Sequence, residues 1–171
     1  LKPNFNSADA FPGSTHNDTL AGLIRELQAR GAGAITVGDR SGMGDTRRVM
    51  EQNGIFRLAE ELGVEPLVFD ELDADGWKMV GPPGSHWKQG FAVARPVLDA
   101  DVVVQTCCLK THRFGGHFTL SLKNTIGLVA KRVPGQRHDY MRELHGSPHQ
   151  RLMIAEANGA YEPEIGRASC R

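Results

Sequence analysis

The stretch Asp101-Val102-Val103-Val104-Gln105-Thr106-Cys107-Cys108-Leu109 is the most strand-like part of the chain. Its apolar run is nearly continuous rather than alternating, which is typical of a parallel strand that is covered on both faces. We therefore expect residues 101–109 to form the central strand of a parallel sheet. The charged segment that begins at Lys110 would then lie at the carboxyl end of that strand.

The sequence before this strand alternates between helical and β-rich segments. Helix-capping residues at 14–18 precede apolar residues at helical spacing, and a second helical pattern spans 46–62. Short β-rich runs lie at 34–39 and 65–70. This order predicts an α/β fold with a mainly parallel open sheet and helices on both faces.

The remaining segments are less regular. Residues 76–94 contain a Pro-Pro-Gly turn and are interpreted as a loop or an antiparallel excursion. Helices are expected over 123–132 and from Ser147-Pro148 to Ala160. Residues 117–122 fit either a strand or the start of a helix.

Both ends of the sequence look cut. The chain opens with Leu1 rather than methionine, and residues 2–6 read like the exit of a strand whose body lies upstream. Residues 164–171 lack periodicity and are interpreted as a non-native tail, so we expect a single α/β domain fragment over residues 1–163. The compartment stays open, with the cytoplasm slightly favoured.

Composition indicates an ordinary globular domain. The 171 residues are 40% hydrophobic and 23% charged, and no apolar run approaches the length of a membrane span. Lys+Arg and Asp+Glu number 20 each, and this balance argues against nucleic-acid binding by the domain as a whole. The three cysteines form no C-x-x-C pattern and do not suggest a disulfide framework.

The zero net charge conceals a basic block. Residues 110–151 hold 8 basic and 2 acidic side chains, together with five of the seven histidines. Such a block attracts anions, although a solvated basic face would have the same composition. Nucleic-acid binding by this block is a weaker hypothesis, because aromatic side chains are sparse in it. His138, His145 and His149 are interpreted as polar loop residues, one of which could line a pocket.

Three segments are expected to leave the carboxyl ends of parallel strands, and therefore to converge on one edge of the sheet. They are residues 2–6, 38–44 and 110–117. The glycine-rich second segment could cradle an anion at a helix start, although a flexible turn fits equally well. Asp39, at the strand exit, is the acidic residue that we expect to orient a histidine or a cation.

The segment 110–117 carries the densest set of reactive side chains. We expect Lys110 and Arg113, with Lys123 further along the chain, to bind a carboxylate or a phosphate. Asn124 would donate a hydrogen bond to the same ligand. The alternative is a surface loop whose charges are only solvated.

The histidines of this segment suggest proton transfer or metal binding. His112 or His117 would carry a proton or hold a metal ion, and Gly115-Gly116 would let backbone N–H groups approach the ligand. Cys107 and Cys108 are adjacent on a strand and point to opposite faces, so one metal ion can hardly bind both. We interpret them as small buried residues.

Two motifs resemble the signature of a known family. Cys107-Cys108-Leu109-Lys110-Thr111-His112 and the later stretch Leu120-Ser121-Leu122-Lys123-Asn124-Thr125-Ile126-Gly127-Leu128-Val129 resemble the K-T-H and K-N-x-x-G motifs of domain-of-unknown-function family 362. Lys2-Pro3-Asn4 and the strand exit Val37-Gly38-Asp39 are also similar to that family. The resemblance covers residues 1–163, and the later C-terminal part of the family's domain is missing.

The resemblance implies a redox setting. Some members of that family carry ferredoxin-like iron–sulfur modules, and others carry export signals. This chain has no ferredoxin cysteine pattern, so an implied metal or iron–sulfur cluster would lie outside it. A more distant likeness is to the N-terminal domain of nickel-pincer lactate racemases, in which a His- and Lys-bearing loop holds an anionic cofactor.

Two hypotheses of function follow. The first is an enzyme that acts on a carboxylate- or phosphate-bearing substrate at the loop of Lys110 to His117, with a metal or redox link left open. The second is a non-catalytic metal or iron–sulfur-associated binding module that serves a redox partner. Under either, we expect a small anionic ligand, no nucleic acid, no membrane span, and a redox partner or a homo-oligomer.

Overall fold

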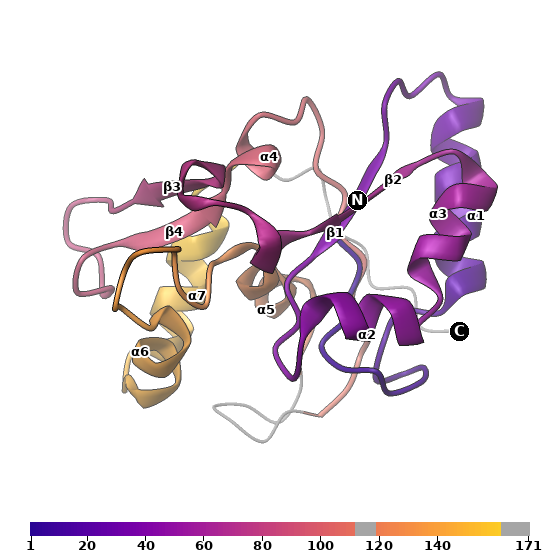
Figure 1. The fold of residues 1–171 in the computed structure, drawn as a ribbon. Coiled ribbons are helices and arrows are strands. Elements are labelled where there is room, and N and C mark those ends of the chain that lie inside the picture. Colours follow the sequence, from indigo (N-terminus) through magenta and orange to yellow (C-terminus); the bar gives the residue numbers. More distant parts are fainter. Residues whose placement is uncertain (112–118, 162–171) are drawn as a thin grey trace.

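The structure is a computed structural model that describes residues 1–111 and 119–161 (Figure 1). The helices are α1 (Asn17–Ala29), α2 (Thr46–Gln52), α3 (Ile55–Leu62), α4 (Arg95–Leu98), α5 (Ser121–Asn124), α6 (Tyr140–Gly146) and α7 (Gln150–Asn158). The strands are β1 (Thr36–Asp39), β2 (Glu65–Val68), β3 (Trp77–Val80) and β4 (Phe91–Ala94). Short 3₁₀ helices lie at Phe69–Glu71, Ala74–Gly76 and Thr125–Leu128.

The mixed α/β content that the sequence predicts is confirmed. β1 and β2 are parallel, with Thr36 opposite Glu65, and α2 and α3 connect them. Residues 1–3 extend this sheet, because the backbone N–H of Gly38 donates to the carbonyl of Leu1 (3.0 Å). The backbone N–H of Lys2 in turn donates to the carbonyl of Val104 (2.8 Å). Residues 1–3 therefore lie between β1 and residues 104–106.

The predicted central strand over residues 101–109 does not form as a regular strand. It meets the first residues of the chain only at an isolated parallel bridge between Lys2 and Gln105. The next backbone N–H that could donate to this segment, that of Asn4, donates instead to Oγ1 of Thr15 (2.8 Å), and the carbonyl of Thr106 accepts from Nδ2 of Asn124 (3.0 Å). The hydrogen-bonded ladder therefore ends after one bridge. Among the described residues no regular strand pairs with the other side of this segment, so it is not the centre of the sheet.

The predicted open sheet with helices on both faces is therefore not confirmed. Within the described residues, the regular strands form one parallel pair, β1–β2, and one antiparallel pair, β3–β4. In the second pair Trp77 lies opposite Ala94, so residues 76–94 adopt the antiparallel alternative.

Two predicted helices differ from the observed ones. The helix expected over 46–62 is divided into α2 and α3, because Gly54 adopts a left-handed conformation with φ of 71°. The helix expected over 123–132 is replaced by α5 and a 3₁₀ helix that ends at Leu128. The last helix, α7, begins at Gln150 rather than at Ser147, and α6 was not predicted.

Two hydrophobic clusters hold these elements together. One packs α1, α2 and α3 against β1 and β2, with Phe5 and Met50 fully buried in it. The other packs the β3–β4 hairpin against α6 and α7, with Phe91 and Tyr140 fully buried (Figure 1). Arg40 connects the two regions, because its Nε donates to the carbonyl of Val129 (2.9 Å).

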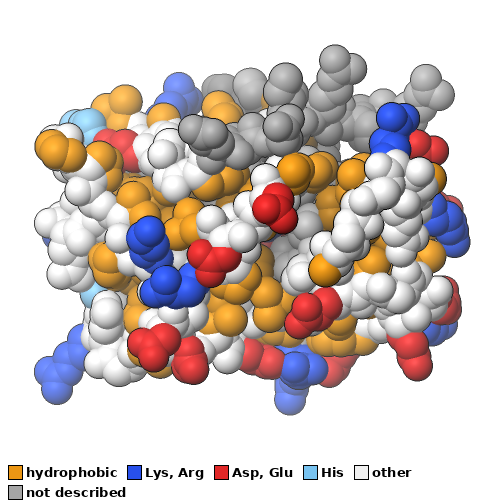
Figure 2. Space-filling view, turned by 90° about the horizontal axis from the view of Figure 1, so that it is seen from above, with side chains coloured by type: hydrophobic (Ala, Val, Ile, Leu, Met, Phe, Trp, Pro, Cys, Tyr) orange, Lys and Arg blue, Asp and Glu red, His pale blue; other side chains and the backbone are white. Residues whose placement is uncertain are grey.

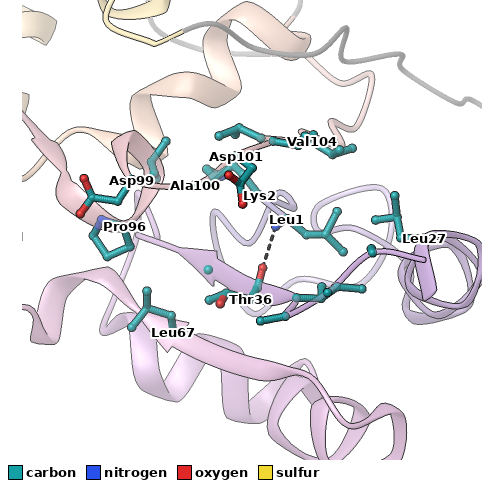
Figure 3. Close-up of a pocket in the computed structure, with 18 of the residues that line it drawn as sticks. Leu1, Lys2, Leu27, Thr36, Leu67, Pro96, Asp99, Ala100, Asp101 and Val104 are labelled. Atoms are coloured by element: carbon teal, nitrogen blue, oxygen red, sulfur yellow. Dashed lines mark hydrogen bonds between the residues drawn. The ribbon is translucent and has the colours of Figure 1, made fainter. Parts of the chain in front are cut away.

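A cleft of about 440 Å³ lies between the β1–β2 pair and the segment that follows α4. Leu67 of β2, Pro96 of α4 and Val104 face it, and the backbone nitrogen of Leu1 donates to the carbonyl of Thr36 (2.6 Å) inside it (Figure 3). The side of the molecule that Figure 2 shows carries many hydrophobic side chains, with acidic side chains among them. In the described part of the chain, no helix combines the length and apolar character needed to cross a bilayer.

Candidate functional site

The three strand exits line one cavity of about 440 Å³. Asn4 belongs to the first exit, Asp39 to the second, and Lys110 to the described part of the third. Two helices add further side chains to the wall, since Lys123 lies on α5 and His145 on α6. The site is thus assembled from segments that are distant in the sequence.

A buried ion pair forms the floor of this cavity. Nζ of Lys2 lies 2.7 Å from Oδ1 of Asp39, and each side chain is only 3% exposed. The same amine donates to the carbonyl of Pro3 (2.6 Å) and to Oδ1 of Asn124 (2.9 Å). Burial lowers the pKa of Lys2, whereas the carboxylate of Asp39 acts in the opposite direction. All three donors of the ammonium group are used, as a buried charge requires.

Asp39 is also tied to the backbone. Its Oδ2 accepts the N–H of Phe5 (2.7 Å), and its Oδ1 accepts the N–H of Arg40 (2.7 Å). The carboxylate therefore fixes the first two strand exits to each other. It orients the cation of Lys2, and no histidine of the described segments is bonded to it.

Arg40 is buried directly beside this pair. Its guanidinium donates to the carbonyls of Val129 and Ile126, so the side chain holds the 3₁₀ segment after α5 against the end of β1. Burial lowers the pKa of Arg40, and Asp70 and Asp39 oppose that shift. Arg40 supplies positive potential to the cavity while its hydrogen bonds serve the fold.

Lys110 reaches into the cavity from the third exit. Its Nζ donates to Oδ1 of Asn4 (3.1 Å) and to the carbonyl of Gly13. Burial lowers the pKa of Lys110, with Cys108 and Asp39 opposing this effect. Two of its three N–H donors therefore have acceptors in the described part of the chain, which leaves one for a ligand.

Lys123 differs from the other cations of the wall. Its pKa is lowered to about 8, first by burial and then by the positive charges of Arg40, Lys2 and Lys110. Among residues 1–111 and 119–161, its Nζ forms no hydrogen bond and no ion pair. The amine thus lies in a cationic environment without a neutralising carboxylate from these residues.

His145 contributes an imidazole to the same wall. Its Nδ1 lies 2.7 Å from the carbonyl of Met141, so this nitrogen carries the hydrogen and donates it. Burial lowers the pKa of His145, and the charges of Lys123 and Arg40 lower it further. The ring is therefore neutral near pH 7, and its second nitrogen has basic character.

The model of the family described as "Domain of unknown function (DUF362)" matches residues 1–166. The chain belongs to the DUF362 family. This confirms the resemblance seen in the sequence, and the likeness to the lactate racemases is not shown by it. Neither the curated proteins nor the solved structures give a match.

Two residues of the K-N-x-x-G motif, Asn124 and Gly127, lie against the buried ion pair of Lys2 and Asp39. Nδ2 of Asn124 donates to the carbonyls of Lys2 (3.3 Å) and Thr106 (3.0 Å), and so joins two strand exits. A Cβ atom on Gly127 would lie 2.5 Å from Cε of Lys2 and 2.7 Å from Oδ1 of Asp39. Only glycine leaves room for the pair at this position, while Lys123 of the same motif faces the cavity.

Four of the predicted site residues lie in the cavity wall. They are Asp39, Lys110, Lys123 and Asn124. The amide of Asn124 donates to backbone carbonyls, and Asp39 is paired with Lys2. These two side chains therefore hold the cavity wall in place and are not available to bind a ligand directly. The other five predicted residues, His112, Arg113, Gly115, Gly116 and His117, lie outside the described residues.

Sequence reasoning did not assign a role to Lys2, Arg40 or His145. Lys2 and Arg40 lie in the predicted strand exits, so their position on the converging edge was an available signal. The sequence places His145 among three loop histidines of which one could line a pocket; it lies in α6 rather than in a loop, and it lines the cavity. Its place depends on a helix that the local sequence did not reveal.

The part of the chain that the structure describes contains no complete set of metal ligands. No three His, Cys, Asp or Glu side chains there lie close enough to hold a metal ion. Cys107 and Cys108 are both buried, at 7% and 4% exposure, as the sequence interpretation expects.

Proposed function

We propose that this DUF362 chain is an enzyme domain that acts on a carboxylate- or phosphate-bearing substrate in the cavity at the strand exits. The observation that carries the proposal is the charge of the wall. The described lining residues include five cationic side chains, from Lys2, Arg40, Lys110, Lys123 and Lys131, and three carboxylates. A small anion is the ligand that complements such a wall.

The carboxylates of the wall form no ion pair with Lys110 or Lys123 in the described part of the chain. Asp39 is committed to Lys2 at 2.7 Å, and Asp139 accepts a hydrogen bond from Arg132 at 2.9 Å. Asp9 accepts the hydroxyl of Ser7 (2.7 Å) in an exposed position. Lys110 and Lys123 are therefore left to meet a ligand, and cations crowded in a partly dry cavity are relieved by a bound anion.

An enzyme also needs a proton carrier beside the bound substrate. We assign this role to His145, because its neutral imidazole shares the cavity with Lys123. A general base must be unprotonated at the operating pH, and the lowered pKa of His145 meets this condition. His112 and His117 remain candidates for the same role.

Equilibrium binding of oxalate and of inorganic phosphate tests the proposal. We expect Lys110→Met and Lys123→Met each to lower the affinity by about tenfold or more, since a charge-assisted hydrogen bond contributes about 1.5–3 kcal/mol. The matched control is Lys78→Met, which removes an exposed lysine of β3 and should leave the affinity unchanged. Equal affinities for wild type and all three variants would reject the site.

The alternative is a non-catalytic metal or iron–sulfur-associated module for a redox partner. It is supported by the family resemblance and by His112 and His117. Metal analysis of the full-length, anaerobically purified protein separates the two proposals. Stoichiometric iron or nickel favours the module or a metalloenzyme, and anion binding without metal favours the enzyme as described above.

A further inference from the structure

We propose that Lys123 is a covalent nucleophile, and that the substrate class of the cavity is a 2-oxo acid whose carbonyl carbon Lys123 attacks to form an imine. This inference rests on the proposed anion-binding function and specifies its substrate. It assigns to Lys123 a bond-forming role, in addition to the electrostatic role that any cation of the wall could have.

The first argument is the contrast between Lys123 and the other lysines of the wall. Nζ of Lys2 is held by three acceptors, and Nζ of Lys110 by two. Nζ of Lys131 lies 2.9 Å from a carboxylate oxygen of Asp70. For Lys123, the described residues offer neither an ion pair nor a hydrogen bond. Among these four lysines, Lys123 therefore has the amine that is available to react.

The second argument is the set of charges that faces this amine. Arg40 approaches from the end of β1, Lys2 from the first strand exit, Lys110 from the third, and His145 from α6. The three cations favour loss of the Lys123 proton, and the neutral imidazole does not oppose it. A lysine whose pKa is lowered by a neighbouring cationic group is an established form of amine nucleophile.

The fraction of reactive amine follows from these surroundings. With a pKa of about 8, about one-tenth of Lys123 is neutral at pH 7. A lysine at the ordinary value of 10.5 is neutral in only about one molecule in three thousand. Lys123 should therefore react with carbonyl compounds far faster than the exposed lysines of the same chain.

The third argument concerns the substrate. A simple carboxylate or phosphate offers no electrophilic carbon of the kind an amine attacks, whereas a 2-oxo acid carries a carbonyl carbon next to its carboxylate. Lys110 has one N–H donor left for the carboxylate, and Lys123 lines the same cavity of about 440 Å³. This volume suits a small organic acid. One molecule can thus satisfy both lysines.

The step balances without an additional reagent. The lone pair of neutral Nζ attacks the carbonyl carbon, the C–N bond forms, and the π electrons of the C=O bond move to oxygen, which takes up the first amine proton. Loss of the resulting hydroxyl group with the second amine proton releases one water molecule and leaves a C=N imine. Protonation of the imine nitrogen restores a positive charge close to the bound carboxylate.

Borohydride trapping with pyruvate, the simplest ketone of this class, tests the inference. Incubation of the whole chain with pyruvate and borohydride should add to one lysine the mass of pyruvate, less one water and plus two hydrogens. Peptide mapping should place this adduct on Lys123, with Lys78 and Lys88 as exposed internal controls. The rate of trapping should rise with pH around a midpoint of about 8.

The variant Lys123→Arg tests the nucleophile directly. It keeps a positive charge but cannot form an imine, so trapping should fall to background. Oxalate binding by the wild-type chain separates this inference from the proposed function. Absence of an adduct in a wild-type chain that binds oxalate would overturn the inference and leave anion binding intact. An adduct shared equally among the exposed lysines would also overturn it. Absence of oxalate, phosphate and pyruvate binding would reject the proposed function itself.

Discussion

The cavity at the strand exits and the cleft beside α4 have the same volume, about 440 Å³ each, but opposite chemistry. The cavity is lined by cations and by amide and carboxylate groups from several loops and from the helices α5 and α6. The cleft is lined mainly by hydrophobic residues such as Leu67, Phe69 and Val103. The exposed Asp99 and Asp101 lie at the same cleft as Leu67 (Figure 3). Size alone therefore does not identify the functional site.

The cavity and the cleft differ because their walls are formed by different kinds of structure: loops line much of the cavity, and the face of a strand pair lines much of the cleft. Backbone groups of paired strands are occupied by each other, so the face of the β1–β2 pair offers mainly side chains of packing residues. Loops that leave the strand ends must satisfy their own polar groups, and they do so here through Asp39, Asn124 and Lys2. The polar network that fixes the loops is what places Lys110 and Lys123 at the cavity.

The largest expected effect concerns the floor of the cavity. Lys2→Met would leave Asp39 buried without its cation, and removal of one partner of a buried pair costs about 3–5 kcal/mol of unfolding free energy. Urea denaturation measures this loss. The matched control is Arg30→Met, since the pair of Arg30 with Glu26 is 78% and 69% exposed and should contribute less than about 1 kcal/mol. Equal losses in the two variants would contradict the buried network.

The next effect is the pH dependence that Lys123 imposes. Its pKa is about 8 in the folded chain and 10.5 when unfolded, so between these values the unfolded chain binds more protons and stability rises with pH. Below pH 8 both states are protonated and the full cost, about 3 kcal/mol, is present. Lys123→Met should be more stable than wild type at pH 7, and this advantage should shrink from pH 8 to 10.5. A difference that is independent of pH would disagree with a buried amine.

A smaller effect is expected for the glycine of the K-N-x-x-G motif. In Gly127→Ala the added Cβ would meet Lys2 and Asp39 at 2.5–2.7 Å, and overpacking of this kind costs about 1–3 kcal/mol. Thermal unfolding monitors the change. Gly22→Ala in α1 is the control, because no atom lies within 4 Å of its added Cβ and helix propensity favours alanine. An equally stable Gly127→Ala chain would show that the pair does not need this space.

The smallest effect is expected at the cleft. Asp99→Asn and Asp101→Asn alter exposed carboxylates, so the free energy of unfolding should change by less than about 0.5 kcal/mol. Oxalate affinity should also stay the same, because these groups lie outside the cavity wall. A gain or loss of oxalate affinity comparable to that of the Lys110 variant would make the two hollows parts of one site.

The sequence predicts several individual helices and strands correctly, but it does not predict which segments pair to form the sheet. The spacing of apolar residues locates α1, β1 and β2, because a single helix face or strand determines each of them. The run at 101–109 predicts a central strand, yet it pairs through one isolated bridge, because the next N–H of its partner segment, that of Asn4, donates to Thr15 instead. Pairing partners are tertiary information that a local apolar run does not contain.

The candidate site shows the same division. Convergence of strand exits and local charge density point to Asp39, Lys110, Lys123 and Asn124, and these four lie in one wall. Whether each of them supports the fold or faces a ligand depends on its hydrogen bonds in the folded chain, and the sequence does not show these bonds. The amide of Asn124 is occupied by Lys2 and by backbone carbonyls. Lys123 has no ion-pair partner among the described residues, and its charge alone does not distinguish it from the other cations.

The most direct test of the cavity is the number of protons taken up when an anion binds. Calorimetric titration with oxalate near pH 8, in buffers of different ionisation enthalpy, measures this number. A bound dianion raises the pKa of Lys123, so the wild-type chain should take up protons on binding, and Lys123→Arg should bind oxalate with reduced uptake. Failure of oxalate to bind, or an unchanged uptake in the variant, would contradict the claim that these amines exist to hold an anion.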